Sequence, residues 1–337
     1  MKSTDRRSFL KFAASSLGIG VLYSAYPASV HAAASSSKEA DGLFSALARE
    51  NGEKPSAFSF VQLSDAHVGF NGPPDPLRTK AFERAVEMIN ALPTRPDLVL
   101  FTGDLTHDTE DHDVHVQRMK QFQEIAKRIN VPLIKSVPGE HDAGLDNGAL
   151  YREFFGETHY SFDHRGVHFV ALDNVTRAKP EVGAEQLQWL KKDLARFPKT
   201  APIVVFTHRP LFDLRPDWEW FTSDGDDVMN VLSTYDNLTV LYGHIHRDDE
   251  HQTGSVRHYA ARSLVFAFPD PAGVQGPRKP LPFDKEHPFK NLGIRTVRFN
   301  SQSQPGSAPL ALQDVELTAR EFGGINGVHQ MLRNPNV

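Results

Sequence analysis

The sequence of 337 residues contains no cysteine. This absence excludes a disulfide framework, a thiolate zinc site, an iron–sulfur cluster and a cysteine nucleophile. Any metal site must therefore be built from nitrogen and oxygen ligands. The sequence does contain 16 histidines, which are either scattered or gathered in one site. With 39% hydrophobic and 23% charged residues, the chain has a globular rather than a disordered composition.

A long hydrophobic run is also missing, even at the N-terminus. Residues 12–26 are only mildly apolar and are too short for a membrane-spanning helix, which needs about 20 apolar residues. Arg6 and Arg7, followed by Phe-Leu-Lys, resemble a twin-arginine (Tat) export signal, and Val-His-Ala at 30–32 fits a signal-peptidase site. We predict a signal peptide at 1–32 and a linker or N-terminal arm at 33–55. The alternatives are a basic disordered end or an uncleaved anchor.

The charge balance is acidic. The chain carries a net charge of −5, and the predicted signal peptide contributes +3, so the mature protein would carry −8. We therefore expect no binding to nucleic-acid polymers and no membrane span in the mature protein. A small anionic substrate is still compatible with this balance, because bound metal ions override the average charge locally.

Short apolar runs alternate with helical patterns along the chain. Strands are predicted at 58–63, 97–102, 132–137, 203–207 and 239–242, a hairpin at 160–163 and 167–172, and helices at 78–92, 114–129, 184–197 and about 227–235. Short strands and a proline-rich loop at 269–288 follow. No repeat divides the chain, so we predict a single domain at 56–337 with a mixed α/β architecture.

Five short segments carry side chains that are typical metal ligands. They are Asp65-Ala66-His67, Gly103-Asp104, Gly139-Glu140-His141-Asp142, Thr207-His208 and Gly243-His244-Ile245-His246. Each follows a predicted strand, and the carboxyl ends of neighbouring strands converge on one crevice. Imidazole and carboxylate ligands favour zinc, manganese, iron or cobalt. We expect the glycines at 103, 139 and 243 to let the backbone turn sharply beside this site.

The order of these motifs resembles the calcineurin-like metallophosphoesterase superfamily. The Asp-x-His opening is similar to its class III cyclic-nucleotide phosphodiesterase branch, and the likeness runs from about Phe58 to Ala261. The resemblance implies a four-layer α-β-β-α sandwich of two mixed sheets flanked by helices. It also implies a metal-dependent phosphoric ester hydrolase, either a phosphodiesterase or a phosphatase.

The resemblance implies a site with two divalent or trivalent ions of manganese, iron or zinc. Asp65, His67, Asp104 and His246 would hold the first ion, and Asp104, Glu140, His208 and His244 the second, with Asp104 bridging. A hydroxide that bridges the metals would attack phosphorus. His141 would assist the leaving oxygen, and Asp142 would orient His141 through a hydrogen bond.

Glu140 departs from the family pattern, which has asparagine at this position. Together with Asp65 and Asp104 it raises the ligand charge to −3, against −2 for the usual pattern. We hypothesise that the second metal is held more tightly, or that a more highly charged ion is tolerated. We also expect a dianionic monoester to gain less attraction than usual, relative to a monoanionic diester. The alternatives are a replacement with little effect and, ranked lowest, impaired catalysis.

Several residues near these motifs are candidates for substrate contact. His107 either contacts the substrate or supports a ligand, or is an ordinary loop histidine. Arg209 and Arg262 are candidate phosphate contacts. Trp218 and Trp220 lie in an aromatic loop at 211–221, which either caps the substrate or is pinned by its own aromatic rings. His112 and His115 are expected at a solvated helix start, with a separate metal site as the less favoured alternative.

The leading hypothesis is an exported, periplasmic or secreted dinuclear phosphoesterase. We expect it to act on a small phosphoester, with phosphodiesters ahead of phosphomonoesters and phospholipids, and to depend on the Tat machinery for export. The alternative is a non-catalytic metal-binding or interaction protein that keeps the fold. The pair His141 and Asp142 favours catalysis, because a pure metal binder does not need it.

Overall fold

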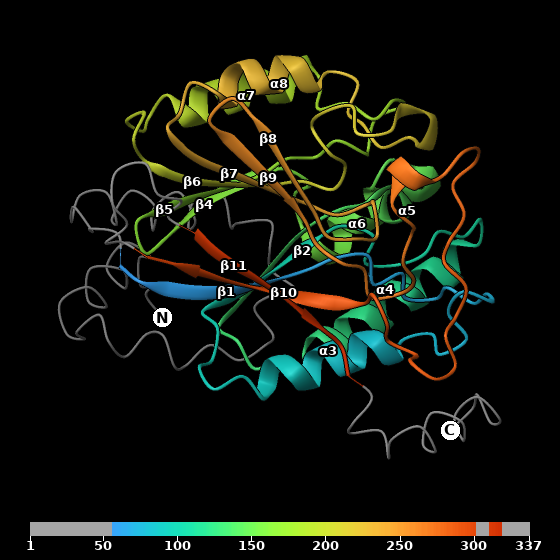
Figure 1. Cartoon of the computed structure of the whole chain (residues 1–337). Helices are drawn as coiled ribbons and strands as arrows, with labels where there is room; N and C mark the ends of the chain where they lie inside the picture. Colours follow the sequence, from blue (N-terminus) through green and yellow to red (C-terminus); the bar gives the residue numbers. More distant parts are fainter. Residues whose placement is uncertain (1–55, 301–309, 319–337) are drawn as a thin grey trace, which may run out of the picture. The chain divides into compact units, whose positions relative to one another are not determined.

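The computed structural model describes residues 56–300 and 310–318. The predicted signal peptide and the arm lie outside the described residues, so these boundaries and the single-domain extent stay predictions. The described residues form two mixed sheets stacked face to face with helices on both outer sides, and this confirms the predicted four-layer sandwich (Figure 1). Within the described part of the chain, no helix is long and apolar enough to cross a membrane.

The first sheet has the order β11-β10-β1-β2-β3. Its members are β1 (Phe58–Leu63), β2 (Leu98–Thr102), β3 (Leu133–Val137), β10 (Gly293–Phe299) and β11 (Leu310–Glu316). The first three run parallel, whereas β10 is antiparallel to β1 and β11 is antiparallel to β10.

The second sheet has the order β4-β5-β6-β7-β9-β8. It contains β4 (Tyr160–His164), β5 (Val167–Ala171), β6 (Pro202–Phe206), β7 (Asn237–Tyr242), β8 (Asp249–Thr253) and β9 (Val256–Ala260). Strands β5, β6, β7 and β9 are parallel, and the two edge strands are antiparallel to their neighbours. The predicted hairpin is confirmed: Arg165 and Gly166 have φ of 46° and 77°, as a two-residue type I′ turn requires.

Strand alternation builds the layers. In β1, Phe58 and Phe60 enter the core between the sheets, while Val61 and Leu63 face the core on the other side. That outer core contains α3 (Lys80–Asn90) and α4 (His112–Ala126). On the second sheet, α7 (Ala184–Leu194) and α8 (Gly225–Leu232) pack in the same way (Figure 1). Each sheet thus buries both faces, which fits the apolar runs of its central strands.

Some elements differ from the sequence-based expectation. Helix α4 begins at His112, two residues early, because the Asp111 side chain caps it by accepting from the backbone N–H of Val114. His115 is buried rather than solvated, since it lies on the face of α4 that packs on the sheet. The prediction did not include two short helices, α5 (Glu140–Ala143) and α6 (Ala149–Phe155), or the 3₁₀ turns η2 (Gly144–Asp146), η3 (Pro216–Trp218) and η4 (Pro271–Gly273).

Candidate metal centre

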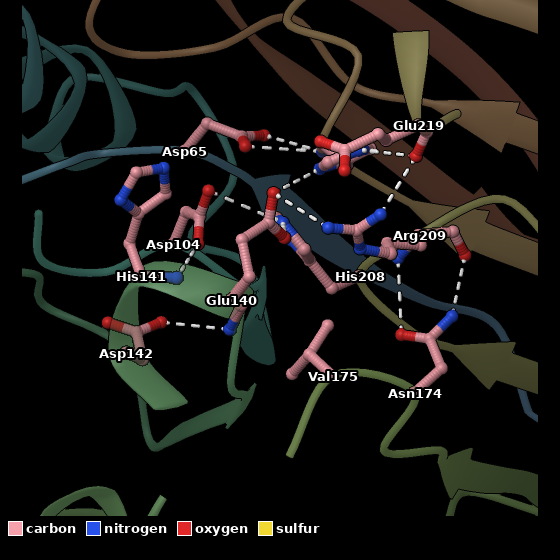
Figure 2. Close-up of polar contacts among 12 residues, drawn as sticks. Asp65, Asp104, Glu140, His141, Asp142, Asn174, Val175, His208, Arg209 and Glu219 are labelled. Atoms are coloured by element: carbon pink, nitrogen blue, oxygen red, sulfur yellow. Dashed lines mark hydrogen bonds and ion pairs between the residues drawn. The ribbon is translucent and has the colours of Figure 1, made fainter. Parts of the chain in front are cut away.

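The candidate ligands lie where five parallel strands end. Asp65 follows β1, Asp104 follows β2, Glu140 follows β3, His208 follows β6, and His244 begins the segment after β7. The two sheets therefore contribute to one site from both sides (Figure 2). This is the convergence expected of carboxyl ends of parallel strands.

The structure brings the predicted ligands together in two adjoining groups. The potential ligand atoms of Asp65, His67, Asp104 and His246 all lie within 4.8 Å of one another, and those of Glu140, His208 and His244 form a second such group. Asp104 lies between the groups, because its Oδ2 is 3.3 Å from Nε2 of His67 and 3.4 Å from Nε2 of His208. The first group is the set that the resemblance implied for the first ion, and the second group holds the residues implied for the second ion apart from Asp104.

Five of the seven ligands have an unusual backbone conformation. Asp65, His67, Asp104, His244 and His246 have φ of 54°, 41°, 50°, 67° and 52°. Left-handed φ costs a residue with a side chain about 1–3 kcal/mol, and such strain concentrates at functional sites. Nothing in the sequence signalled this conformation, because aspartate and histidine have no glycine-like preference for it that a pattern would reveal.

The three glycines beside the ligands matter mainly because they leave space. A Cβ on Gly139 would lie 2.1 Å from Oδ1 of Asp104, and one on Gly243 would lie 2.0 Å from Oγ of Ser64. Only Gly103 also needs the left-handed region, with φ of +93°. The expected sharp turn is therefore found at Gly103, whereas Gly139 and Gly243 are glycines because any side chain would displace a ligand.

Backbone carbonyls orient three of the imidazole rings. Nδ1 of His208 is 2.7 Å from the Thr102 carbonyl, Nδ1 of His246 is 2.9 Å from that of Phe266, and Nε2 of His244 is 3.1 Å from that of Glu219. A carbonyl only accepts, so each of these ring nitrogens donates its N–H. The opposite nitrogen of each ring is thereby left with its lone pair for the cluster.

The donor set fits a metal ion. Oε2 of Glu140 and Nε2 of His208 are buried and 2.8 Å apart, yet neither has a hydrogen-bond partner of acceptable geometry. Because Nδ1 of His208 donates to a carbonyl, a proton or a metal ion between Nε2 and Oε2 would satisfy both atoms. Burial alone would lower the pKa of His208, but Asp104 and Glu140 raise it well above its ordinary value. The cluster therefore attracts cations, and its nitrogen and oxygen ligands suit zinc, manganese or iron.

His141 stands beside the ligands with a carboxylate partner. Its Nδ1 is 2.5 Å from Oδ1 of Asp108, and its ring lies 4.7 Å from that of His67. Burial would lower the pKa of His141, but Asp104 and the hydrogen bond to Asp108 raise it to about 9. An imidazole held in its protonated form by such a carboxylate is able to donate a proton.

The predicted hydrogen bond from Asp142 to His141 is wrong. The Asp142 carboxylate accepts from the backbone N–H groups of Leu105, Thr106 and Gly139 at 2.8–2.9 Å, and thus ties two site loops together. The reason is geometric: consecutive residues on a helix do not share a face. Asp108 holds His141 instead. Sequence reasoning missed Asp108, because only its place four residues after Asp104 distinguished it from a surface aspartate.

His107 is brought to the site, and three other candidates are not free for substrate. The His107 ring stacks 4.6 Å from that of His141, and burial with the charge of His141 lowers its pKa to about 4. Trp218 and Trp220 are 2% and 0% exposed, so neither ring has a face for a base or a lipid, and the pinned-loop alternative holds. Arg262 pairs with Asp248 and Glu316 rather than facing the ligands.

Arg209 reaches the ligand cluster without facing solvent. Its guanidinium donates to the Glu219 carbonyl at 2.8 Å and lies 3.4 Å from Oε1 of Glu140, and the residue is 9% exposed. Burial would raise the pKa of Glu140, but His244, His208 and Arg209 hold it well below its usual range. Arg209 thus contacts a ligand rather than presenting an open phosphate-binding fork.

A cavity of about 560 Å³ lies beside the segment 265–267. Phe266 lines it, and the same ring lies 4.7 Å from the ring of His246 and 6.1 Å from that of His67. Phe70 packs 5.1 Å from Phe266. Phe266 therefore contacts two candidate ligands and also lines the cavity.

The fold and the cluster define the class of protein as an α/β sandwich with a candidate metal centre of nitrogen and oxygen ligands. A family model described as calcineurin-like phosphoesterase matches residues 58–248. The chain is 28% identical over 201 residues to a probable glycerophosphodiester phosphodiesterase, GpdQ, from Arcobacter nitrofigilis; the match covers 56% of this chain and 71% of that protein. It is 23% identical over 196 residues to a 3′,5′-cyclic-nucleotide phosphodiesterase from Nostoc sp., with coverage of 56% and 71%.

A serine/threonine-protein phosphatase, CPPED1 from Mus musculus, is 29% identical over 190 residues, covering 49% of this chain and 58% of that protein. Two solved structures show the same fold at 14% identity. They are a dimetal phosphatase from Danio rerio (TM-score 0.50, covering 77% of this chain and 98% of that chain) and a purple acid phosphatase from yellow lupin (TM-score 0.55, 78% and 52%). The chain belongs to the calcineurin-like phosphoesterase family and is a metal-dependent phosphoester hydrolase.

Proposed function

We propose that this protein is an exported dinuclear phosphoesterase that prefers phosphodiesters. The observation that carries the proposal is the pair of ligand groups on either side of Asp104, with His141 beside them. The names of two relatives, both phosphodiesterases, support the preference for diesters. A scavenging role outside the cytoplasm fits such substrates, which include glycerophosphodiesters and nucleotides.

The residues divide into binding and proton-transfer roles. Asp65, His67 and His246 would hold the first ion, Glu140, His208 and His244 the second, and Asp104 both. Two bound ions would supply charge neutralisation at the phosphate oxygens and a water of lowered pKa. His141, kept protonated and oriented by Asp108, donates its proton to the departing alkoxide oxygen. Asp142 keeps the loops after β2 and β3 in register.

The test is purification followed by metal analysis and assay. Bis-aryl and mono-aryl phosphates are compared with manganese, zinc and iron added in turn. We expect about two ions per chain and faster hydrolysis of the diester. Two bound ions with no hydrolysis across a broad phosphoester panel would favour a non-catalytic metal-binding protein instead.

Export is tested separately from chemistry. Replacement of Arg6 and Arg7 by lysine is expected to retain the protein in the cytoplasm, since the paired arginines are the recognition element of a Tat signal. N-terminal sequencing of the exported wild type is expected to begin at Ala33. Unchanged export of the double-lysine variant would remove the Tat assignment and leave the proposed hydrolase activity untouched.

A further inference from the structure

We propose that Arg209 is an internal counter-ion of Glu140. The two charges cancel, so the net charge beside the second metal position equals that of a site with a neutral ligand at position 140. The inference rests on the proposed two-metal site for its functional meaning. It concerns a residue that sequence reasoning had considered only as a phosphate contact.

The contacts place Arg209 against the ligand and away from solvent. Its guanidinium lies 3.4 Å from Oε1 of Glu140 (Figure 2). The same oxygen lies 2.7 Å from Nδ1 of His244. The side chains of Arg209 and Glu140 are 11% and 26% exposed. At this burial a charge–charge contact is screened much less than on an open surface.

Arg209 is held in place by its neighbours rather than by the substrate. The side chain of Asn174 bonds both the carbonyl and the N–H of Arg209, at 3.0 and 3.3 Å. The Glu219 carbonyl accepts from the guanidinium at 2.8 Å (Figure 2). It also accepts from Nε2 of His244 at 3.1 Å. Arg209 and a metal ligand therefore share one acceptor. An arginine fixed in this way is a permanent part of the second ligand group.

Arg209 changes the net charge of the ligand groups. With neutral histidines, Asp65, Asp104 and Glu140 contribute −3, and Arg209 returns the total to −2. The site is therefore no more negative than one with an amide at position 140. This revises the hypothesis drawn from Glu140 alone, because tighter binding of the second metal is not expected once Arg209 is counted.

A double-mutant cycle tests the pair through stability alone, with no measurement of activity. Glu140→Gln, Arg209→Gln and the double variant are compared with wild type after the metals have been stripped with a chelator. Glu140→Gln leaves the Arg209 guanidinium without its carboxylate, Arg209→Gln leaves Glu140 with only His208 and His244 beside it, and the double variant removes both charges. We expect both singles to unfold at lower temperatures, and the double to unfold at least ~3 °C above the value that additive losses predict.

Metal titration gives the second readout. We expect Glu140→Gln to lose affinity for the second manganese or zinc ion. Adding Arg209→Gln to this variant should raise that affinity about tenfold or more, because the unpaired guanidinium charge is gone. Arg209→Lys, which keeps the charge, is expected to bind metal like wild type. If the single variant Arg209→Gln does not fold, the affinities of Glu140→Gln and of the double variant for the second ion still test the inference.

Arg295 and Asp314 provide a matched control. Their side chains form two 2.8 Å bonds, the Arg295 side chain is 3% exposed, and neither residue belongs to the ligand groups. Arg295→Gln, Asp314→Asn and their double variant should show coupling in stability but unchanged metal affinity. Additive stability losses at Glu140 and Arg209, or a double variant that binds the second ion no better than Glu140→Gln, would overturn the inference. An inactive enzyme with an intact cycle would instead contradict only the proposed function.

Discussion

The carboxylate of Asp108 makes the most direct prediction at the scale of single residues. Asp108→Asn keeps an acceptor near Nδ1 of His141 but removes the negative charge that stabilises its protonated form. We expect kcat for a bis-aryl phosphate to fall about tenfold to a hundredfold with KM nearly unchanged, because a partner of a catalytic group is lost and no binding group is.

The matched control for this variant is Asp111→Asn. Asp111 is an exposed aspartate three residues further on, and asparagine caps a helix as well as aspartate does. The control should retain wild-type kcat. An unchanged kcat in Asp108→Asn would show that His141 needs no carboxylate, and the assignment of its partner would be withdrawn.

Gly243 allows a test of the space beside the first ligand group. In Gly243→Ala the new Cβ would lie 2.0 Å from Oγ of Ser64 and 2.8 Å from Oδ2 of Asp65. We expect the displaced Asp65 to lower bound metal to about one ion or fewer per chain, with about 1–3 kcal/mol lost from the free energy of unfolding. Metal analysis and urea unfolding provide the measurement. Gly273→Ala, where nothing lies within 4 Å of the added Cβ, should behave like wild type.

At the scale of elements, the aromatic loop at 211–221 supports the second ligand group from outside. Trp218 and Trp220 are buried on either side of Glu219, and their rings meet edge to face at 4.9 Å. Between them Glu219 adopts φ of 62° and directs its carbonyl to Arg209 and His244. The loop thus acts through a backbone atom, and the exposed Glu219 side chain has no part in this support.

Two substitutions at position 219 separate the backbone from the side chain. Glu219→Gly keeps the carbonyl and relieves the left-handed strain, so we expect unchanged metal content and a melting temperature equal to wild type or slightly higher. Glu219→Pro cannot reach positive φ and loses the N–H that bonds the Pro216 carbonyl, so the second ion should be lost. Loss of metal in the glycine variant would mean that the carboxylate itself is needed.

The elements also show where sequence reasoning succeeds and where it ends. The strands before Asp65, Asp104 and His208 are apolar runs followed at once by ligands, so both the strand and the ligand could be predicted. Helix α5 spans only Glu140–Ala143, which is too short for a periodic pattern. The partner of His141 depends on which way each side chain of that turn points. Direction within a four-residue helix is a tertiary property, and for this reason sequence reasoning named Asp142 and missed Asp108.

At the scale of the whole molecule, a buried charged network joins three elements far from the ligand groups in sequence. Nδ1 of His168 on β5 is 2.6 Å from Oδ1 of Asp163 on β4, and its Nε2 is 2.7 Å from Oδ2 of Asp193 on α7. Ser161 and Arg196 also donate to Asp193. With a carboxylate at each nitrogen, the imidazole is held in its protonated form.

This network predicts how stability depends on pH. Burial would lower the pKa of His168, but Asp163 and Asp193 raise it above 6.5, so its contribution is complete below about pH 6.5 and is lost as pH rises through the raised pKa. Burial would raise the pKa of Asp193, but His168 and Arg196 lower it below 3.8, so this contribution is complete above about pH 3.8 and is lost on further acidification. The network therefore stabilises the protein most between about pH 4 and 6.5.

His168→Gln measures this contribution directly. We expect the variant to lose about 3 kcal/mol of the free energy of unfolding at pH 5.5, because removing the cation leaves two carboxylates close together and partly buried. The difference from wild type should shrink as the pH rises through the raised pKa of His168, because the wild-type imidazole then also gives up its proton. Urea unfolding of both proteins at each pH gives the difference, from which effects of pH on the metal site cancel. A difference that stays constant from pH 5.5 to 9 would mean that His168 stabilises the sheet edge as a neutral packed ring, held by hydrogen bonds alone.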